Sequence, residues 1–344
     1  MTLVDSVLKG DRLALARLLT HVENNTVDGR TALRLLFPRT GTAHLIGVTG
    51  APGTGKSSLV NRLALHFRGK NKRVAIAAVD PSSPFTGGAV LGDRVRMKDL
   101  SSDPDIFIRS MASRGALGGL ARSTAGIVQV FDAAGYDMIL IETVGAGQGE
   151  VDIVRLAHTT LVVEAPGLGD DIQAIKAGIL EIADILVVNK ADRPGVENTE
   201  KALRSVLELA HPTPRTHVHH GQALTPDVAV ETSAEGWNIP ILRTVSTDGQ
   251  GIAELAEQIE RHSNYLRASG DWSRREQRRL ASELDAILRE TLLHQFHAGL
   301  PEGRYNEVVR QVIDKQLSPD EAAQDLIDGG TPTPAGGRGS RRAR

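Results

Sequence analysis

The chain of 344 residues contains no cysteine, and this absence excludes both disulfide bonds and metal sites built on thiolate ligands. It also lacks any uncharged apolar stretch that approaches the roughly 18 residues of a membrane-spanning helix. Charges interrupt the amino-terminal segment early, so it does not have the pattern of a secretory signal peptide. These absences fit a reducing compartment, and we expect a soluble, cytoplasmic protein without membrane contact.

Neither sign of charge is in excess. The chain carries 40 Lys and Arg residues against 42 Asp and Glu residues, which gives a formal net charge of −2 at pH 7. This balance provides no overall field that would attract nucleic acid or an anionic membrane, so we expect neither as a partner. The length suffices for one large domain with appendages or for two domains.

Short apolar runs alternate with helical stretches through the middle of the chain. Continuous apolar runs separated by helices indicate a mostly parallel sheet that is covered by helices on both faces. The predicted strands are residues 45–49, 73–79, 106–109, 138–142, 161–164, 185–189 and 241–245. The predicted fold class is therefore α/β, and ligands of such sheets bind beyond the carboxyl ends of the strands.

Helical spacing dominates both ends of the chain. Residues 4–36 have a helical pattern, and the apolar face of one segment contains Leu13, Leu15, Leu18, Leu19 and Val22. After residue 262 the strand pattern stops. Residues 272–296 are typical of one long amphipathic helix, with an apolar face of Leu280, Leu284, Ile287, Leu288 and Leu292. Shorter helices are predicted over residues 305–315 and 319–327.

A phosphate-binding motif follows the first predicted strand. Residues 50–57 read Gly-Ala-Pro-Gly-Thr-Gly-Lys-Ser, and a helical stretch comes directly after them. Glycines allow backbone angles closed to other residues, so successive N–H groups can turn toward a polyphosphate. We expect Lys56 at the β- and γ-phosphates and the Ser57 hydroxyl on Mg²⁺. The predicted nucleotide-binding residues of this loop are Gly50, Ala51, Pro52, Gly53, Thr54, Gly55, Lys56, Ser57 and Ser58.

Acidic residues follow or end two other predicted strands. Asp80 follows one strand and begins the segment that contains Asp93, while Glu142 ends another strand. Carboxylates at strand ends beside a phosphate loop act on Mg²⁺ or on its waters, so we expect all three on the metal side. For Asp80, capping a turn before Pro81 explains the residue equally well.

The segment after Glu142 is rich in glycine, which permits the chain to move when a γ-phosphate leaves. Gln148 in this segment is a candidate for positioning the attacking water by analogy with other GTPases, although a surface glutamine fits the pattern as well. Lys56, Glu142 and Gln148 make up the predicted catalytic set.

Residues 189–192 read Asn-Lys-Ala-Asp at the end of a late strand. The Asp192 carboxylate can accept two hydrogen bonds from the N1–H and N2–H₂ edge of guanine, a donor pair that adenine lacks. Asn189 is expected to join this segment to the phosphate loop, and the aliphatic stem of Lys190 to cover one face of the base. The motif therefore predicts GTP and GDP as the ligands.

A last base contact is expected from a later loop, for which residues 231–235 and 244–252 are the two candidates. Only the second follows an apolar run and leads into a helix. We therefore expect the backbone N–H groups of Ser246 and Thr247 to reach the guanine O6.

These motifs predict four segments along the chain: an amino-terminal helical segment (1–40), a P-loop GTPase domain (41–262), a helical arm (263–328) and a disordered tail (329–344). The tail is assigned on its richness in Gly, Pro and Arg.

The motifs in register resemble the MeaB/MMAA/ArgK family from about residue 5 to about residue 300. Members of this family are G-protein chaperones of adenosylcobalamin-dependent methylmalonyl-CoA mutase and related acyl-CoA mutases. The stretches that carry the resemblance are residues 50–57, Asp80-Pro-Ser-Ser, Thr86-Gly-Gly, Leu91-Gly-Asp and residues 142–148, 166–176 and 189–192.

The resemblance implies roles for particular segments. It places Asp80, Asp93 and Glu142 on the magnesium side, with switch segments between Asp80 and Asp93, over residues 142–150, and over residues 165–176. It also implies a homodimer held by the helical arm. One departure is at residues 246–251, which read Ser-Thr-Asp-Gly-Gln-Gly where the family usually has Ser-Ala followed by Gly-Glu-Gly.

The predicted function is a Mg²⁺-dependent GTPase that gates adenosylcobalamin loading and protection of methylmalonyl-CoA mutase or a related acyl-CoA mutase. Hydrolysis is expected to be slow in isolation, because no arginine finger is evident. One alternative is a metallochaperone GTPase, which needs a Cys/His metal motif. The other is an ATPase or kinase serving amino-acid transport, against which the Asn189–Asp192 motif argues.

Overall fold

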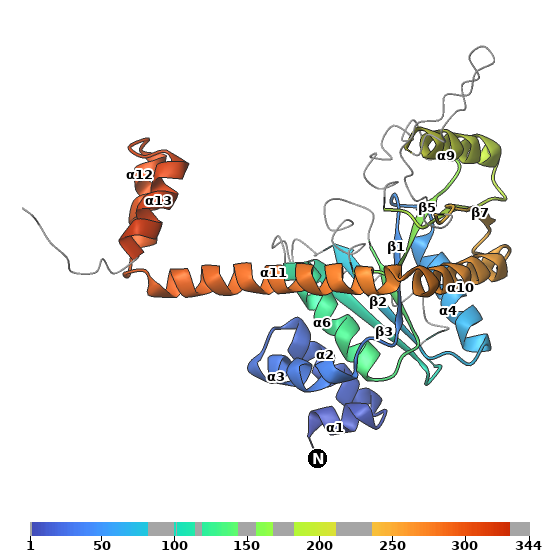
Figure 1. Ribbon diagram of the computed structural model, residues 1–344, viewed down its shortest axis with the longest axis horizontal. Helices are drawn as coiled ribbons and strands as arrows, with labels where there is room; N and C mark the ends of the chain where they lie inside the picture. Colours follow the sequence, from blue (N-terminus) through green and yellow to red (C-terminus); the bar gives the residue numbers. More distant parts are fainter. Residues whose placement is uncertain are drawn as a thin grey trace, which may run out of the picture. The chain divides into compact units, whose positions relative to one another are not determined.

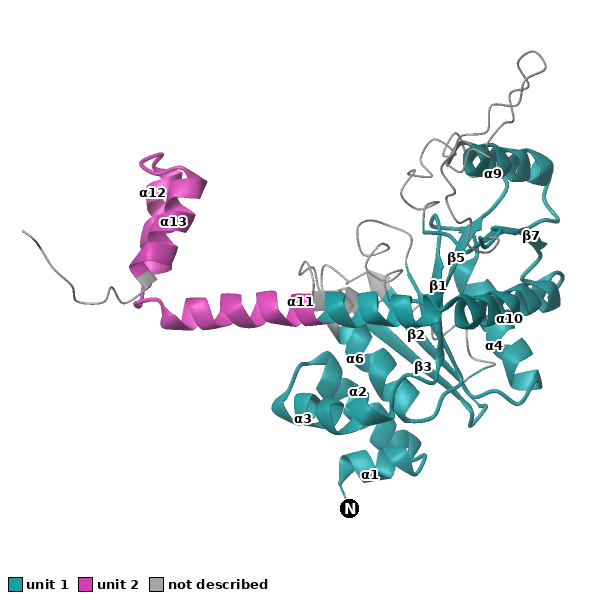
Figure 2. Cartoon of the chain, in the orientation of Figure 1, with its two compact units in different colours: residues 1–283 teal, residues 284–344 magenta. Residues whose placement is uncertain are grey.

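The computed structural model describes residues 2–81, 100, 102–113, 119–143, 156–167, 182–210 and 236–330. For residues 80, 81, 112, 113, 119–122, 209, 210 and 330 the description is limited to the backbone. The chain divides into two compact units, residues 1–283 and residues 284–344 (Figure 2). Each unit is described by itself.

Unit 1 is built on a seven-stranded sheet with the order β3-β2-β4-β1-β5-β6-β7, and all of its described pairings are parallel (Figure 1). Each predicted apolar run forms a strand, so the predicted α/β class is confirmed. The strands are β1 (His44–Thr49), β2 (Val74–Pro81), β3 (Ile106–Ser113), β4 (Met138–Glu142), β5 (Thr159–Glu164), β6 (Ile185–Asn189) and β7 (Ile241–Thr244).

Helices cover both faces of this sheet, because successive strand residues point to opposite faces and both sets are apolar. On one face, α4 (Lys56–Gly69) and α10 (Ile252–Ser269) pack against residues such as Ile46 and Val187. On the other face, α6 (Gly119–Ala133) packs against residues such as Ile139, and α9 (Val196–Ala210) packs against Leu186. The amino-terminal helices extend the α6 side of the core.

The helical pattern predicted over residues 4–36 forms three helices, α1 (Leu3–Leu8), α2 (Arg12–Glu23) and α3 (Val27–Leu36), followed by the 3₁₀ turn η1 (Phe37–Arg39). The breaks follow from left-handed backbone angles at Gly10 (φ 85°) and Asn25 (φ 51°), which end a helix. The Asp11 carboxylate then caps α2 by accepting hydrogen bonds from two backbone N–H groups. Of the predicted apolar face of this segment, Leu15 and Leu18 are buried, but Leu13 is 61% exposed.

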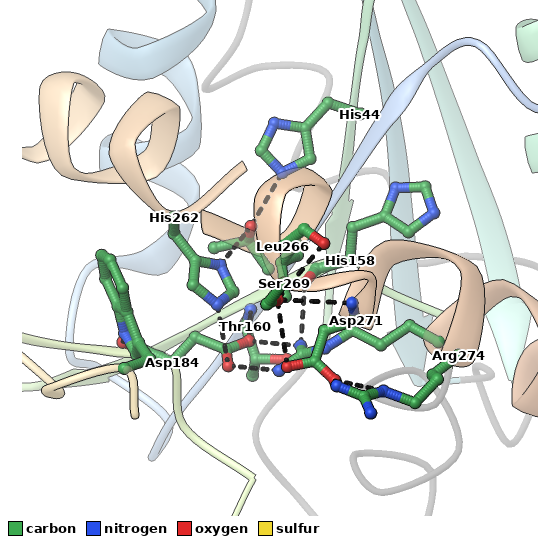
Figure 3. A network of polar contacts seen from close by, with 12 residues as sticks. His44, His158, Thr160, Asp184, His262, Leu266, Ser269, Asp271 and Arg274 are labelled. Atoms are coloured by element: carbon green, nitrogen blue, oxygen red, sulfur yellow. Dashed lines mark hydrogen bonds and ion pairs between the residues drawn. The ribbon is translucent and has the colours of Figure 1, made fainter. Parts of the chain in front are cut away.

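The predicted boundary at residue 262 is wrong, because it falls inside the unbroken helix α10. His262 of that helix is buried and belongs to a network of polar contacts (Figure 3). Its Nδ1 lies 2.8 Å from the hydroxyl of Thr159 at the amino end of β5. The first part of α11 (Asp271–Gly299) also binds the sheet, since Arg275 donates to Asp184 directly before β6. These contacts move the boundary to Glu283 and Leu284.

Unit 2 contains the rest of α11 together with α12 (Arg304–Ile313) and α13 (Pro319–Gly330), which confirms the three predicted carboxy-terminal helices. Its small core joins Val308, Ala322 and Leu326. The predicted disordered tail begins too early, because residues 329 and 330 still belong to α13 and residues 331–344 lie outside the described part. No helix in the described part of the chain has the length and apolarity needed to cross a membrane.

Candidate functional site

The phosphate-loop motif connects the carboxyl end of β1 to the first residue of α4, as predicted. Three of its glycines have positive φ values, 139° at Gly50, 84° at Gly53 and 94° at Gly55. A Cβ on Gly50 would lie 2.0 Å from the carbonyl oxygen of Val163, and one on Gly55 would lie 2.5 Å from Nδ2 of Asn189. The loop conformation and its close neighbours therefore require glycine at both positions.

Lys56 lies inside the curve of this loop and is 6% exposed. Its Nζ donates hydrogen bonds to the carbonyl oxygens of Gly50, at 2.7 Å, and Ala51, at 3.0 Å. Because α4 begins at Lys56, the first helical turn directs its backbone N–H groups, and the positive end of the helix dipole, toward the same loop. An ammonium group beside a helix amino terminus is a site for an anion such as a polyphosphate.

Ser57 and Glu142 meet at the edge of this loop. Glu142 ends β4, which pairs with β1, and its Oε1 accepts a hydrogen bond of 2.5 Å from the Ser57 hydroxyl. Glu142 is 5% exposed, and the register of β2 on β4 pairs it with Ala78, two residues before Asp80. The backbone thus places three of the predicted magnesium-side residues at one edge of the sheet.

Asp93, which is predicted on the metal side, lies outside the described residues. Gln148, which is predicted in the catalytic set, lies outside them as well. The side chain of Asp80 is also outside the description. Most of the predicted switch segments and the rejected candidate loop at residues 231–235 fall in the same undescribed stretches.

Asn189 joins the predicted base loop to the phosphate loop. Asn189 is 1% exposed, and its Nδ2 donates a hydrogen bond of 2.8 Å to the carbonyl oxygen of Thr54. Its Oδ1 accepts hydrogen bonds from the hydroxyls of Thr244 and Ser246 and from the Ser246 N–H. One buried amide therefore fixes the two loops that follow β6 and β7 against the loop that follows β1.

Lys190 takes a left-handed conformation (φ 56°), and its Nζ donates to the carbonyl oxygen of Gly53 at 2.6 Å. The same loop is tied to β7 by the Ala191 N–H, which donates to the Thr244 carbonyl at 3.0 Å. Asp192 follows in this loop with an exposed side chain. The motif at residues 189–192 and the phosphate loop thus lie together, as the sequence predicts.

The loop after β7 modifies one prediction. The Ser246 N–H, which was expected to face the base, donates to Asn189 at 3.2 Å, so in this structure it does not point toward a nucleotide. Thr247 is exposed, and its N–H makes no hydrogen bond within the described residues. Sequence reasoning also missed Arg62 of α4, which binds the carbonyl groups of this loop; no motif in the sequence marks it.

A family model described as "Methylmalonyl Co-A mutase-associated GTPase MeaB" matches residues 15–300. The chain belongs to this family. A Pyrococcus abyssi relative named as a GTPase is 42% identical over 332 residues, which cover 95% of this chain and 97% of the relative. The protein named "Methylmalonic aciduria type A homolog, mitochondrial" from Mus musculus is 29% identical over 341 residues, 94% of this chain and 78% of its own.

Among solved structures, one described as an LAO/AO transport system kinase superposes with a TM-score of 0.67 at 26% sequence identity, and the match covers 95% of this chain and 96% of the other. The membership confirms the resemblance found in the sequence. Its members are named GTPases, and the site has the phosphate loop and base loop of that class. The chain is a P-loop GTPase that binds guanine nucleotide and hydrolyses GTP.

Proposed function

We propose that this GTPase is Mg²⁺-dependent and acts as a chaperone of an adenosylcobalamin-dependent acyl-CoA mutase, gating the loading and protection of the cofactor. The observation that carries the proposal is the family match over residues 15–300, since the family is described by its association with methylmalonyl-CoA mutase. The mouse relative, named for methylmalonic aciduria, points to the same chemistry. The cytoplasmic location stays a prediction from the sequence.

At the phosphate end, Lys56 exchanges its two carbonyl partners for the β- and γ-phosphate oxygens, with which a charged donor makes stronger hydrogen bonds. The backbone N–H groups of residues 53–58 surround the same phosphates. Placing the γ-phosphoryl group among fixed donors is most of the catalysis that such a site provides, because little covalent chemistry is left to the protein.

The contact between Ser57 and Glu142 fits a magnesium site. Mg²⁺ prefers oxygen ligands, and this pair brings a hydroxyl and a buried carboxylate to 2.5 Å beside the phosphate loop. Ser57 and Glu142 would hold the ion or its waters, together with Asp80 from the neighbouring strand and Asp93. When bound, the ion neutralises charge that develops on the phosphates.

At the base end, we assign the guanine edge to Asp192, one face of the base to the Lys190 stem, and the O6 contact to the Thr247 N–H. Asn189 holds all three in place through the hydrogen bonds to Thr54 and Ser246. A carboxylate that faces N1–H and N2–H₂ is left without these donors when adenine is present, so the site disfavours ATP.

Communication with the mutase is assigned to the segments that follow Glu142, Asp80 and Ala165 along the chain. The predicted switch segment over residues 142–150 begins at Glu142, whose carboxylate contacts Ser57 on the phosphate side of the site. Coupling requires that the GTP and GDP states bind the mutase with different affinity. Gln148 stays a candidate for positioning the attacking water, and hydrolysis without the mutase is expected to be slow.

We also propose a homodimer formed by the helical arm. Leu284, Leu288 and Leu292 follow one another at the four-residue spacing of one helix face, and they are 57%, 47% and 61% exposed in the single chain. Monomeric soluble proteins rarely expose an apolar row of this kind, so a second copy of α11 is a fitting occupant.

The test uses the full chain and an adenosylcobalamin-dependent acyl-CoA mutase encoded in the same genome. We expect the mutase to raise the GTP hydrolysis rate at saturating GTP, and its affinity for the chain to differ about tenfold between GDP and a non-hydrolysable GTP analogue. The Lys56→Ala variant serves as the control without hydrolysis. An unchanged rate together with equal affinities in both nucleotide states would contradict the chaperone proposal.

The two alternative functions make different predictions for the same protein. A metallochaperone needs a cargo-metal motif, yet the chain has no cysteine, and the described residues contain no group of three or more metal-ligating side chains. An ATPase or kinase of amino-acid transport, the name given to the similar solved structure, would let ATP displace labelled GTP at comparable concentration. We expect no such displacement.

A further inference from the structure

We infer that Arg62 of α4 is a positioning residue for guanine recognition, which sets the direction of the Thr247 N–H without touching the nucleotide. The inference rests on the proposed contact between that N–H and the guanine O6. It adds a residue on the helix of the phosphate loop to the determinants of base specificity.

The geometry begins with the guanidinium group. Nε of Arg62 donates a hydrogen bond of 2.9 Å to the carbonyl oxygen of Ser246, and Nη2 donates to the carbonyl oxygen of Thr247. The two acceptors are 184 and 185 residues further along the chain, so the contact is entirely tertiary. A planar fork with fixed donor directions holds two successive carbonyl groups in one orientation.

The carbonyl of Ser246 and the N–H of Thr247 belong to the same peptide unit. The described residues contain no cis peptide bond, and in a planar trans unit the C=O and N–H vectors point in opposite directions. Because Arg62 binds the oxygen of this unit, the Thr247 N–H must point away from Arg62. A cation on the oxygen also polarises the peptide unit, which makes its N–H a stronger donor.

Asn189 fixes the preceding peptide unit from another side. Its Oδ1 accepts hydrogen bonds from the Ser246 N–H at 3.2 Å and the Ser246 hydroxyl at 2.7 Å. Ser246, which is 5% exposed, is therefore held at its N–H, its side chain and its carbonyl group. Thr247 is held at its carbonyl group by Arg62, and its N–H is the donor that remains for a ligand.

The helix that carries Arg62 begins at Lys56, so one rigid element determines the position of the phosphate-binding lysine and of the loop after β7. Asn189 makes a second connection of this kind through the Thr54 carbonyl oxygen. The distance between the loops for the phosphates and for the base is thus set by the side chains of Arg62 and Asn189. Arg62 belongs to no recognisable sequence motif.

The test compares the affinities of three diphosphates for the wild-type chain and for Arg62→Ala. GDP and inosine diphosphate both carry O6, whereas 2-aminopurine riboside diphosphate lacks it. We expect the variant to bind GDP and inosine diphosphate about tenfold more weakly, the effect of one hydrogen bond, and the third ligand less than twofold more weakly. We expect kcat at saturating GTP to be unchanged while KM rises.

Two further variants separate positioning from general stability. Arg62→Lys can reach one of the two carbonyl groups and is expected to recover part of the GDP affinity. Arg68→Ala removes an arginine of the same helix that is paired with Asp103 and should leave all three affinities unchanged. Thermal unfolding checks that each variant is folded.

Equal weakening of all three diphosphates by Arg62→Ala, or no weakening of GDP, would overturn the inference. A wild-type chain that does not prefer GDP to ADP would instead contradict the proposed base contacts, so the two failures are distinguishable.

Discussion

The carboxylate of Asp184 accepts two hydrogen bonds from the guanidinium group of Arg275, at 2.8 Å to Oδ2 and 2.7 Å to Oδ1. Asp184 precedes β6, and its Oδ2 also accepts the Thr160 N–H of β5 at 2.8 Å. Burial, the largest influence, acts to raise the pKa of Asp184, but the contacts of His262 and Arg275 outweigh it and hold that pKa below its usual value. This ion pair attaches the first part of α11 to the amino end of β6, whereas the phosphate and base loops follow the carboxyl ends of the strands.

We predict that Asp184→Asn lowers the free energy of unfolding by about 2 to 3 kcal/mol, because removing one member of a buried pair leaves the other charge uncompensated. The estimate is below the usual range for fully buried pairs, since the Arg275 side chain is 31% exposed. Urea unfolding at neutral pH measures the change. As a control, Arg261→Ala breaks an exposed pair with Glu257 and should cost less than about 1 kcal/mol. Similar losses in both variants would contradict the role given to Asp184.

Two buried histidines on the same edge predict acid sensitivity. Burial lowers the pKa of His44 well below its ordinary value, and the neighbouring His158 adds to this effect. Burial also lowers the pKa of His158, although Glu276 opposes the shift. Both rings are therefore neutral in the folded state at a pH where the unfolded chain already binds protons.

Because the unfolded state takes up protons first, this contribution to stability is complete above about pH 6.5 and is lost as the pH falls toward the folded pKa values. Each histidine adds up to about 1.4 kcal/mol per pH unit to the slope. Urea unfolding between pH 7.5 and 5.5 measures it. His44→Gln should lower by one the number of protons taken up on unfolding and so reduce the slope of the free energy of unfolding against pH. A slope equal to that of the wild type would contradict the assignment. Glu276, whose pKa is lowered to about 2, acts only at lower pH.

The sheet could be predicted because its signal is local. Each strand is a continuous apolar run, and the burial of β1, β4 and β6 on both faces explains that pattern. The polar cluster of His44, Thr159 and His262 could not be predicted, since these residues are scattered along the sequence and meet only through the tertiary fold. For the same reason the sequence pattern predicts the domain boundary too early, inside α10.

The site shows the same division. Motif spacing predicted that Asn189 joins the phosphate loop, and the hydrogen bond to Thr54 agrees with it. The competition between Asn189 and the base for the Ser246 N–H depends on loop geometry that spacing does not contain. Arg62 lies on α4 within an ordinary helical pattern, and only the structure identifies its acceptors.

The proposed dimer predicts that a charge on the exposed apolar row separates the subunits. We expect Leu288→Glu to be monomeric in sedimentation equilibrium at a concentration where the wild type is dimeric, because a buried unpaired carboxylate at the interface is costly. Glu290→Lys, on the opposite side of α11, should remain dimeric. Loss of GTPase activity is not expected in either variant. A dimeric Leu288→Glu chain would show that the interface lies elsewhere.

The magnesium side is tested by Glu142→Gln, which keeps the shape of a buried side chain and removes its charge. We expect kcat at saturating GTP and Mg²⁺ to fall about a hundredfold, the usual cost of removing one group that stabilises developing charge. The concentration of Mg²⁺ required for half-maximal activity should rise. Glu257→Gln, an exposed substitution on α10, is the control. A hydrolysis rate and Mg²⁺ dependence equal to those of the wild type would remove Glu142 from the site.

The base assignment is tested by Asp192→Asn. An asparagine amide still accepts the N1–H of a purine, but its NH₂ group faces the N2–H₂ donor of guanine and suits the C2 carbonyl of xanthine instead. We therefore expect the affinity for GDP to fall about a hundredfold and the affinity for xanthosine diphosphate to rise, measured by competition with a fluorescent nucleotide. Asp248→Asn changes an exposed carboxylate in the loop after β7 and should leave both affinities unaltered. If xanthosine diphosphate binds the Asp192 variant no more tightly than it binds the wild type, the loss of GDP affinity would reflect loop damage rather than a missing contact to the guanine edge.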